Sequence, residues 1–181
     1  MNEMALVEQA ERAAATVLDR IARLDEAIHG AEDGLTGLPF VVRRVVSAAV
    51  SREVAHNTGR DIAAWAAAIA GLTAAVRDAR TIVTRPADMG WPDTIARARL
   101  RAAAARVEGE QPHLERLAAF MERAPAKVAL VPAGFLPKEK VRQALDNLAA
   151  QTEALRAAVA AMPPLAQALR VLSDDAMPRD G

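Results

Sequence analysis

The chain has 181 residues, and its 23 basic and 23 acidic side chains give a formal net charge of zero. Nucleic-acid-binding domains usually carry a basic excess and stacking aromatic side chains. The neutral charge and the aromatic content of 3% therefore argue against a general nucleic-acid binder. Because the chain contains no cysteine, disulfides, thiolate nucleophiles and cysteine-ligated zinc are excluded.

Alanine dominates the composition, with 44 residues, and hydrophobic residues make up 52% of the chain. Alanine forms helices well but fills a core poorly, so we expect a strongly helical chain with a thin core. Arginine provides 20 of the 23 basic residues, which is typical of a GC-rich coding bias, and we expect a bacterial protein. A charged, amphipathic start and the lack of a charge-free apolar run of about 18 residues predict a cytoplasmic protein with no integral membrane segment.

Three stretches repeat apolar residues at alternating steps of three and four residues. This spacing marks the a and d positions of helices that pack along their length. The first stretch comprises Val7, Ala10, Ala14, Val17, Ile21, Leu24, Ile28 and Ala31. The second comprises Ile62, Trp65, Ile69, Leu72, Val76, Ala79 and Val83. The third, with one polar interruption, comprises Val141, Ala144, Leu148, Gln151, Leu155, Ala158 and Met162.

The predicted fold is all-α: an elongated antiparallel bundle of four or five main helices with coiled-coil-like heptad seams. We expect one domain over residues 1–172 and a disordered tail over residues 173–181. In chain order, the predicted helices cover residues 3–31, 39–83, 93–108, a short helix that ends at 123, 137–162 and 165–172.

Glycine and proline mark the predicted helix ends. Residues 39–83 are interpreted as one continuous or kinked helix. The alternative is a new helix start, capped by Thr58 with Asp61 three residues later. Gly109 and Pro112 are expected to interrupt the following helix. The apolar segment 124–136 is predicted to be a buried or partner-contacting connection, and Pro163-Pro164 to stop the penultimate helix.

Each of the three histidines follows a glutamate by three residues: Glu26 and His29, Glu53 and His56, and Glu110 and His113. Such spacing places a carboxylate and an imidazole on one helix face, as in di-iron bundles. The heptad register, however, turns the first two pairs away from the seam, and the third spans a proline. We therefore expect no metal site and no cofactor.

His56 supports one alternative function. An exposed histidine on a helical bundle is how phosphotransfer domains present their acceptor nitrogen, and Arg60 nearby is suited to meeting a phosphate. The residues after His56 lack the lysine and glycine spacing usual in such domains. A solvated surface histidine is the simpler interpretation.

A second candidate region is the basic run that contains Arg97, Arg99, Arg101 and Arg106. Arg97 and Arg101 share one helix face, which would suit an anionic ligand. The overall neutrality of the chain favours a simpler interpretation, in which acids on neighbouring helices balance these arginines.

Apolar side chains give the candidate interaction surface. The broad valine face that includes Val42, Val46 and Val50 is expected to contact more than one neighbour. Trp91, in a turn, is expected to cap the bundle or anchor a partner. Trp65 lies at a d position and is predicted to belong to the core. Two more candidates, in the apolar connection, are Leu130 and Phe135.

Glycine-rich phosphate loops and catalytic triads are not found in the sequence, so we expect no enzyme. The favoured interpretation is a non-catalytic helical scaffold, adaptor or assembly subunit that acts through protein–protein contacts and self-association. One alternative is a histidine-phosphotransfer-like signalling bundle that uses His56. The other is a coat protein whose valine face binds an apolar granule or a membrane surface.

Overall fold

The computed structural model describes residues 3–34, 39–84, 94–128 and 137–174, without the side chains of residues 3, 25–34 and 128. Every secondary-structure element in these ranges is an α-helix, and no strand occurs there, so the all-α prediction is confirmed. The helices are α1 (Glu3–Gly34), α2 (Phe40–Thr58), α3 (Ile62–Val83), α4 (Thr94–Val128) and α5 (Lys138–Ser173).

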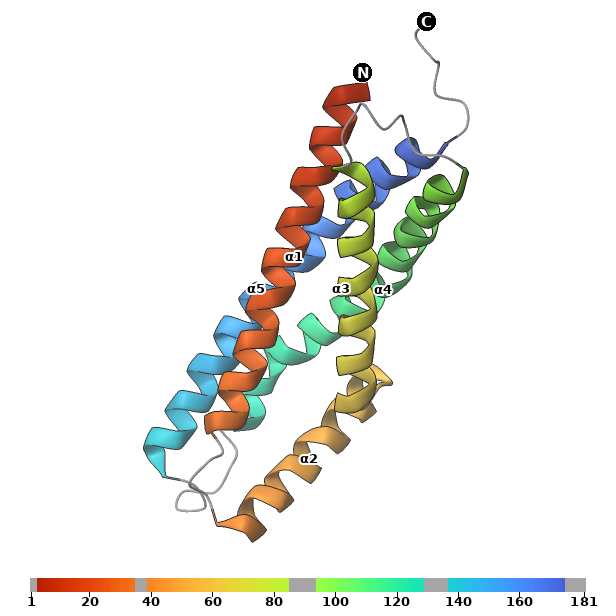
Figure 1. The fold of residues 1–181 in the computed structure, drawn as a ribbon. Coiled ribbons are helices and arrows are strands. Elements are labelled where there is room, and N and C mark those ends of the chain that lie inside the picture. Colours follow the sequence, from red (N-terminus) through yellow and green to blue (C-terminus); the bar gives the residue numbers. More distant parts are fainter. Residues whose placement is uncertain (1–2, 35–38, 85–93, 129–136, 175–181) are drawn as a thin grey trace, which may run out of the picture.

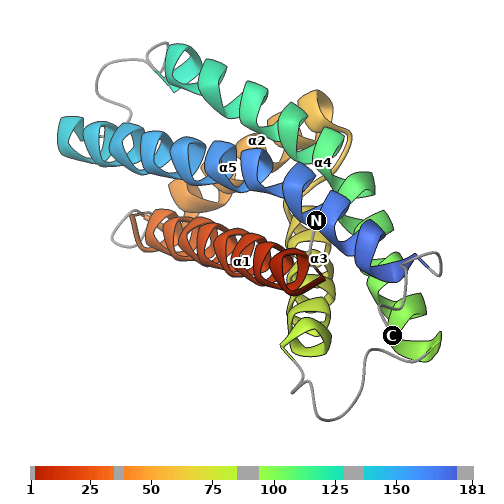
Figure 2. The ribbon, with the colours of Figure 1, turned by 90° about the horizontal axis from the view of Figure 1, so that it is seen from above.

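Four helices surround the core and the fifth lies outside it. Helices α1 and α4 each pack on both α3 and α5, with the most extensive contacts to α5. Helix α2 packs on α4 and contacts α3 only slightly. Figure 1 shows α2 leaving the lower end of α3 at an angle. The view from above shows α1, α3, α4 and α5 arranged around a common centre (Figure 2).

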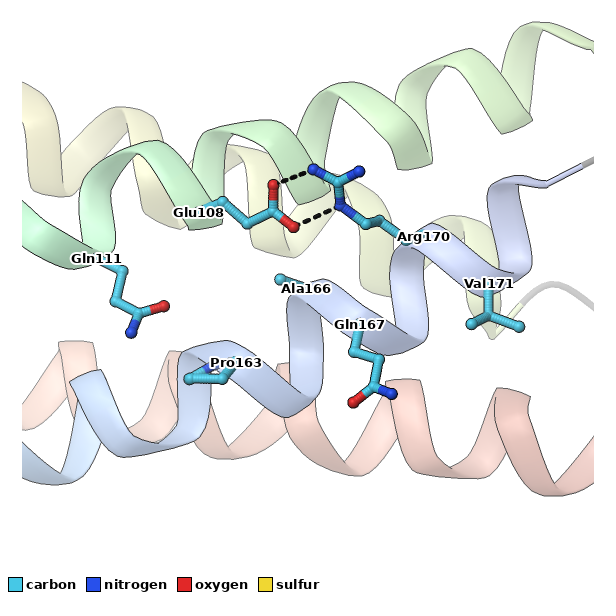
Figure 3. A pocket seen from close by; sticks show the side chains of 7 residues that line it. All are labelled: Glu108, Gln111, Pro163, Ala166, Gln167, Arg170 and Val171. Atoms are coloured by element: carbon cyan, nitrogen blue, oxygen red, sulfur yellow. Dashed lines mark hydrogen bonds and ion pairs between the residues drawn. The ribbon is translucent and has the colours of Figure 1, made fainter.

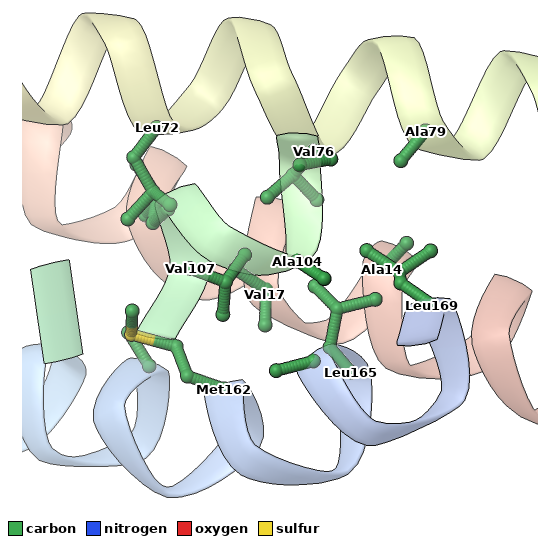
Figure 4. Close-up of a cluster of buried hydrophobic side chains, with 14 of the residues drawn as sticks. Ala14, Val17, Leu72, Val76, Ala79, Ala104, Val107, Met162, Leu165 and Leu169 are labelled. Atoms are coloured by element: carbon green, nitrogen blue, oxygen red, sulfur yellow. The ribbon is translucent and has the colours of Figure 1, made fainter. Parts of the chain in front are cut away.

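The core is filled where these four helices meet. Val17 of α1, Leu72 of α3, Val107 of α4 and Leu165 of α5 point into one cluster (Figure 4) and are at most 1% exposed. Alanines such as Ala104 separate the larger side chains and allow the helices to approach closely. Fully burying one leucine or valine side chain contributes about 1.5–3 kcal/mol, so this cluster is the main source of stability.

Burial follows the three apolar stretches unevenly. In the first, the residues from Ala10 to Leu24 are buried. In the second, Trp65 is buried as predicted, but Ile62 is 44% exposed and Ile69 is only partly buried. In the third, Leu155, Ala158 and Met162 are buried, whereas the residues before Leu155 are half-buried or exposed. The first half of α5 therefore leaves part of its apolar stripe uncovered.

The interpretation of residues 39–83 as one continuous or kinked helix is wrong, and the alternative of a new helix start is correct, although Asp61 and not Thr58 caps the new helix. Gly59 adopts the left-handed conformation with φ of 78° and ends α2, and its N–H donates to the Ala55 carbonyl. Asp61 then caps α3 by accepting a hydrogen bond from the Ala64 N–H at 2.7 Å. A left-handed glycine followed by an aspartate cap ends one helix and begins the next.

The predicted interruption at Gly109 and Pro112 is also wrong, because α4 continues through both residues and through Pro125. Leu114 and Leu117, just after Pro112, are buried in the core. Proline removes one backbone donor and bends a helix, and α4 bends along its length in Figure 2. Core burial on both sides of the bend outweighs the lost hydrogen bond.

Pro163-Pro164 does not stop α5, which runs on to Ser173. The side chains of Met162 and Leu165, on either side of the prolines, are 0% exposed, as are those of Leu169 and Leu172. The prolines themselves are exposed and lie on the outer side of the helix. The apolar contacts thus hold both halves of α5 in helical geometry.

Several predictions concern residues outside the described ranges. Trp91, Leu130 and Phe135 fall there, and so do the last seven residues of the predicted tail. Ser173, the first residue of that tail, is buried at the end of α5.

Candidate interaction site

A buried ion pair anchors the turn between α2 and α3 to α4. Arg60 Nη1 lies 2.6 Å from Glu110 Oε2, and the Glu110 side chain is only 9% exposed. Arg106 Nη2 approaches the other oxygen of Glu110 at 3.6 Å. A Cβ at Gly71 would lie 2.7 Å from that guanidinium, so the glycine leaves room for Arg106 beside α3. Two cations therefore neutralise one buried carboxylate.

A tryptophan completes this anchor. The Arg60 guanidinium lies 5.1 Å from the ring centroid of Trp65, within the range of a cation–π contact. Trp65 Nε1 donates to Thr58 Oγ1 at 2.9 Å, and that hydroxyl donates to the Val54 carbonyl at 2.8 Å. The Trp65 N–H and the Thr58 hydroxyl thus both have hydrogen-bond partners. These contacts hold the C-terminal end of α2 in a fixed direction.

Beyond the anchor, α2 exposes apolar side chains. Thr58 is its only buried residue, whereas Phe40, Val41 and Val45 are 65%, 69% and 55% exposed. Val41, Val45, Ala48 and Ala49 recur at steps of three and four and share one helix face. We call Phe40, Val41, Arg44, Val45, Ala48, Ala49 and Arg52, all exposed, the outer face of α2.

The sequence prediction placed the valine contact on a neighbouring face. Val42 and Val46 are half-buried, and Val50 is 49% exposed. Of the predicted surface residues on α2, Val50 is therefore the most accessible. The more exposed Val41 and Val45 were not singled out, although their four-residue spacing was visible in the sequence.

Helix α2 carries three of the arginines that form no ion pair among the described residues; Arg77 of α3 and Arg123 of α4 are others. Arg43, Arg44 and Arg52 have no ion-pair partner among the residues that the structure describes. Arg43 lies 5.9 Å from the Phe40 ring centroid. Glu53, the one acid of α2, forms an ion pair with Lys127 of α4. The outer face of α2 is therefore both apolar and positively charged.

The basic run of α4 has partners within the chain. Arg99 pairs with Asp78 of α3, Arg106 with Glu110, and Arg101 Nη2 donates to the Ser173 carbonyl at 2.9 Å. The last contact satisfies a carbonyl at the C-terminal end of α5, where a cation is also favoured by the helix dipole. Arg97 interacts with another group as well.

His56 is exposed on α2, as the register predicted. Arg60, the arginine expected to meet a phosphate, is instead engaged by Glu110 and Trp65. His113 Nδ1 lies 2.5 Å from Arg116 Nη2 on α4. Within the described ranges, no three histidine or acidic side chains come together as metal ligands would.

A shallow groove of about 470 Å³ lies between α4 and α5, lined by Glu108, Gln111, Pro163 and Arg170 among others. In Figure 3 the Arg170 guanidinium points to the Glu108 carboxylate, and the two form a bidentate ion pair. Hydrogen bonding to Arg170 lowers the pKa of Glu108 below its usual 4.5 and raises the pKa of Arg170. An internally paired site of this kind has little charge left for a ligand.

Helix α3 is the one described helix that is long and apolar enough to cross a membrane, judged by length and composition alone. The side chains of Leu72, Val76 and Ala79 are buried against neighbouring helices. A single helix that passes this test is weak evidence for a membrane span, and 28% of its apolar window is buried in the structure.

Comparisons with protein-family models, with curated proteins and with solved structures find no match to this chain.

Proposed function

We propose that this protein is a non-catalytic helical scaffold or assembly subunit that acts through protein–protein contacts. The observation that carries the proposal is the exposure of Phe40, Val41 and Val45 on a helix that contributes a single buried residue, Thr58. Large apolar side chains grouped on one exposed face are typical of interaction surfaces. The anchor of Arg60 and Glu110 holds this helix in place for contact.

The architecture is part of the same proposal. We infer an elongated antiparallel bundle of α1, α3, α4 and α5 with coiled-coil-like seams, from which α2 projects. Two observations support it: consecutive helices of this set run in opposite directions in Figure 1, and buried residues in α1 recur at steps of three and four from Ala10 to Leu24.

Coating of an anionic membrane or granule surface is a second candidate, favoured by the unpaired Arg43 and Arg44 beside exposed valines. Arg52 argues against it, because on the helix circumference it lies between Val41 and Val45. A bilayer that covered the valines would also desolvate this guanidinium, which is costly. A protein surface can place a carboxylate there instead.

Site-specific photo-crosslinking in the native cell tests the proposed function. A photoreactive phenylalanine analogue at Val45 should form adducts with protein. The same residue at Ala22, an exposed position on α1, is the matched control. Protein adducts at Val45 well above those at Ala22 support the scaffold. Equal yields at both positions, or lipid adducts alone, would contradict it.

A further inference from the structure

We propose that the outer face of α2 binds the first half of α5 in a second copy of this chain, and that two copies make this contact reciprocally. The inference rests on the proposed function and names its partner. It is carried by complementary unpaired charges on two half-exposed helical segments.

The basic side of the contact has a regular spacing. Arg44, Ala48 and Arg52 follow one another at steps of four residues, all exposed. The two guanidinium-bearing residues are separated by eight residues, or about 12 Å at 1.5 Å per residue. The alanine between them adds little bulk, so another helix can approach closely there. Neither arginine has an ion-pair partner among the described residues.

The acidic side of the contact lies on α5. Asp146 and Glu153 are exposed, seven residues apart, which is about 10.5 Å along the helix. They share a face with Ala149, which is also exposed. Neither acid has an ion-pair partner in the part of the chain that the structure describes. The spacing of these two carboxylates therefore nearly matches that of the two arginines.

Most other charges of the described residues are used internally, although Arg43, Arg77 and Arg123 also form no ion pair there. Described arginines within 4.0 Å of a described carboxylate oxygen include Arg12, Arg20, Arg23, Arg60, Arg80, Arg99, Arg106, Arg142, Arg156 and Arg170. In particular Arg142 and Arg156, which flank the acidic segment, pair with Glu139 and Glu122. They therefore leave the negative charge of Asp146 and Glu153 uncompensated.

Apolar side chains accompany the charges on α2, and small alanines accompany them on α5. On α5, the exposed Ala149 and Ala150 share the face of Asp146 and Glu153, whereas the half-buried Val141 and Leu148 lie about 140–160° around the helix from Asp146. On α2, Val41 and Val45 are more than half exposed. Side chains at steps of three and four on each helix can interdigitate as ridges and grooves. The valines of α2 would therefore meet the small alanines that lie between the two acids of α5.

Alternative occupants fit less well. Pairing α2 with α2 of another copy would set Arg44 and Arg52 against the same positive charges, which is unfavourable. Recognition by an added β-strand needs a free sheet edge, and the described residues contain only helices. Helix α5 of a second copy offers opposite charge at a similar spacing.

The positions of the two segments permit a closed dimer. Helix α2 and the beginning of α5 lie at the same end of the molecule in Figure 1. A two-fold axis near that end can bring α2 of each copy to α5 of the other. Such an isologous dimer makes the contact twice and leaves no open binding surface for further growth.

Charge reversal with mixing tests the inference in the full-length protein. At tens of micromolar, light scattering after size exclusion should report a wild-type dimer. The variants Arg44→Glu/Arg52→Glu and Asp146→Arg/Glu153→Arg should each lose more than about tenfold in dimer affinity and elute as monomers. Mixed in equal amounts, the two variants should form a heterodimer, because both contacts are then complementary. Arg77→Glu, which reverses an exposed arginine on α3, is the matched control and should remain dimeric.

Three results would overturn the inference: a monomeric wild type, a dimer that either double variant leaves intact, or a mixture that stays monomeric. Circular dichroism of each variant checks that its helices are formed, and the milder Arg44→Gln/Arg52→Gln should weaken the dimer less than the glutamate pair does. A monomeric wild type that still gives Val45 adducts with another protein would remove this dimer but keep the proposed function.

Discussion

Arg60 and Glu110 are separated by 50 residues, yet Arg60 Nη1 lies 2.6 Å from Glu110 Oε2. Their ion pair joins the turn between α2 and α3 to the middle of α4, and Trp65 covers the guanidinium. Together with the packing of α2 on α4 and the ion pair of Glu53 with Lys127, this pair holds α2 in its direction.

Removing the Glu110 carboxylate should destabilise the protein. Glu110→Ala leaves two arginines near a low-dielectric site without their counter-charge and should reduce the free energy of unfolding by about 2–4 kcal/mol. Glu108→Ala is the matched control: it breaks the exposed pair with Arg170 and should cost less than about 1 kcal/mol. Urea denaturation measures both, and equal losses would contradict the structural role of the buried pair.

Sequence patterns predicted the burial of side chains better than the ends of helices. The steps of three and four identify Val17, Trp65 and Met162 as core residues because burial on a helix is periodic. Pro163 illustrates the failure, since a local rule predicted a stop there. The burial of Leu165 and Leu169 stabilises the helix by more than the prolines destabilise it. A local sequence rule misses this because the burial depends on distant parts of the chain.

The candidate site could be predicted only in part from the sequence, because it too depends on contacts between distant parts of the chain. A valine-rich face was recognised, but which side of α2 meets α4 depends on tertiary packing. Val42 and Val46 therefore were chosen although Val41 and Val45 are more exposed. Ion pairing between distant residues, such as Arg60 with Glu110, has no local sequence signal at all.

Two glycines should respond in opposite ways to alanine. Gly59 has φ of 78°, so Gly59→Ala should cost about 1–2 kcal/mol through backbone strain alone, since no atom lies within 4 Å of the added Cβ. Gly109 lies within α4 with similarly open space, and Gly109→Ala should gain about 0.5–1 kcal/mol from helix propensity. Thermal unfolding of both variants gives the comparison. A stabilised Gly59→Ala would mean that α2 and α3 are not separated at this residue.

Shortening a side chain to alanine should cost more stability on the fully buried side of α3 than on its partly buried side. Leu72 is 1% exposed, and Leu72→Ala should cost about 2–4 kcal/mol from lost burial and the resulting cavity. Ile69 is only partly buried, so Ile69→Ala should cost less than half as much as Leu72→Ala. Denaturant unfolding measures the two losses, provided that both variants show the same dependence of the unfolding free energy on denaturant concentration. A larger loss for Ile69→Ala than for Leu72→Ala would indicate that α3 is rotated about its axis.

Acid should weaken the pair between Glu108 and Arg170. Because the pKa of Glu108 is lowered in the folded state, its contribution to stability is present above the unfolded value of about 4.5 and is lost as the pH falls through the folded pKa. The stability of Glu108→Gln should therefore fall less than that of the wild type between about pH 5 and pH 3. Urea unfolding midpoints of both proteins across this pH range test the direction of the difference. A steeper acid loss in Glu108→Gln would contradict it.

His56 provides the test between a scaffold and a signalling protein. Its side chain is exposed on α2, so His56→Ala should change the free energy of unfolding by less than about 0.5 kcal/mol. If the protein acts through the outer face of α2, His56→Ala should also preserve crosslinking from Val45. His56→Gln keeps a polar side chain of similar length and serves as the control. Loss of cellular activity in both variants, with the helices and the Val45 adducts intact, would favour phosphotransfer at the imidazole over a scaffold.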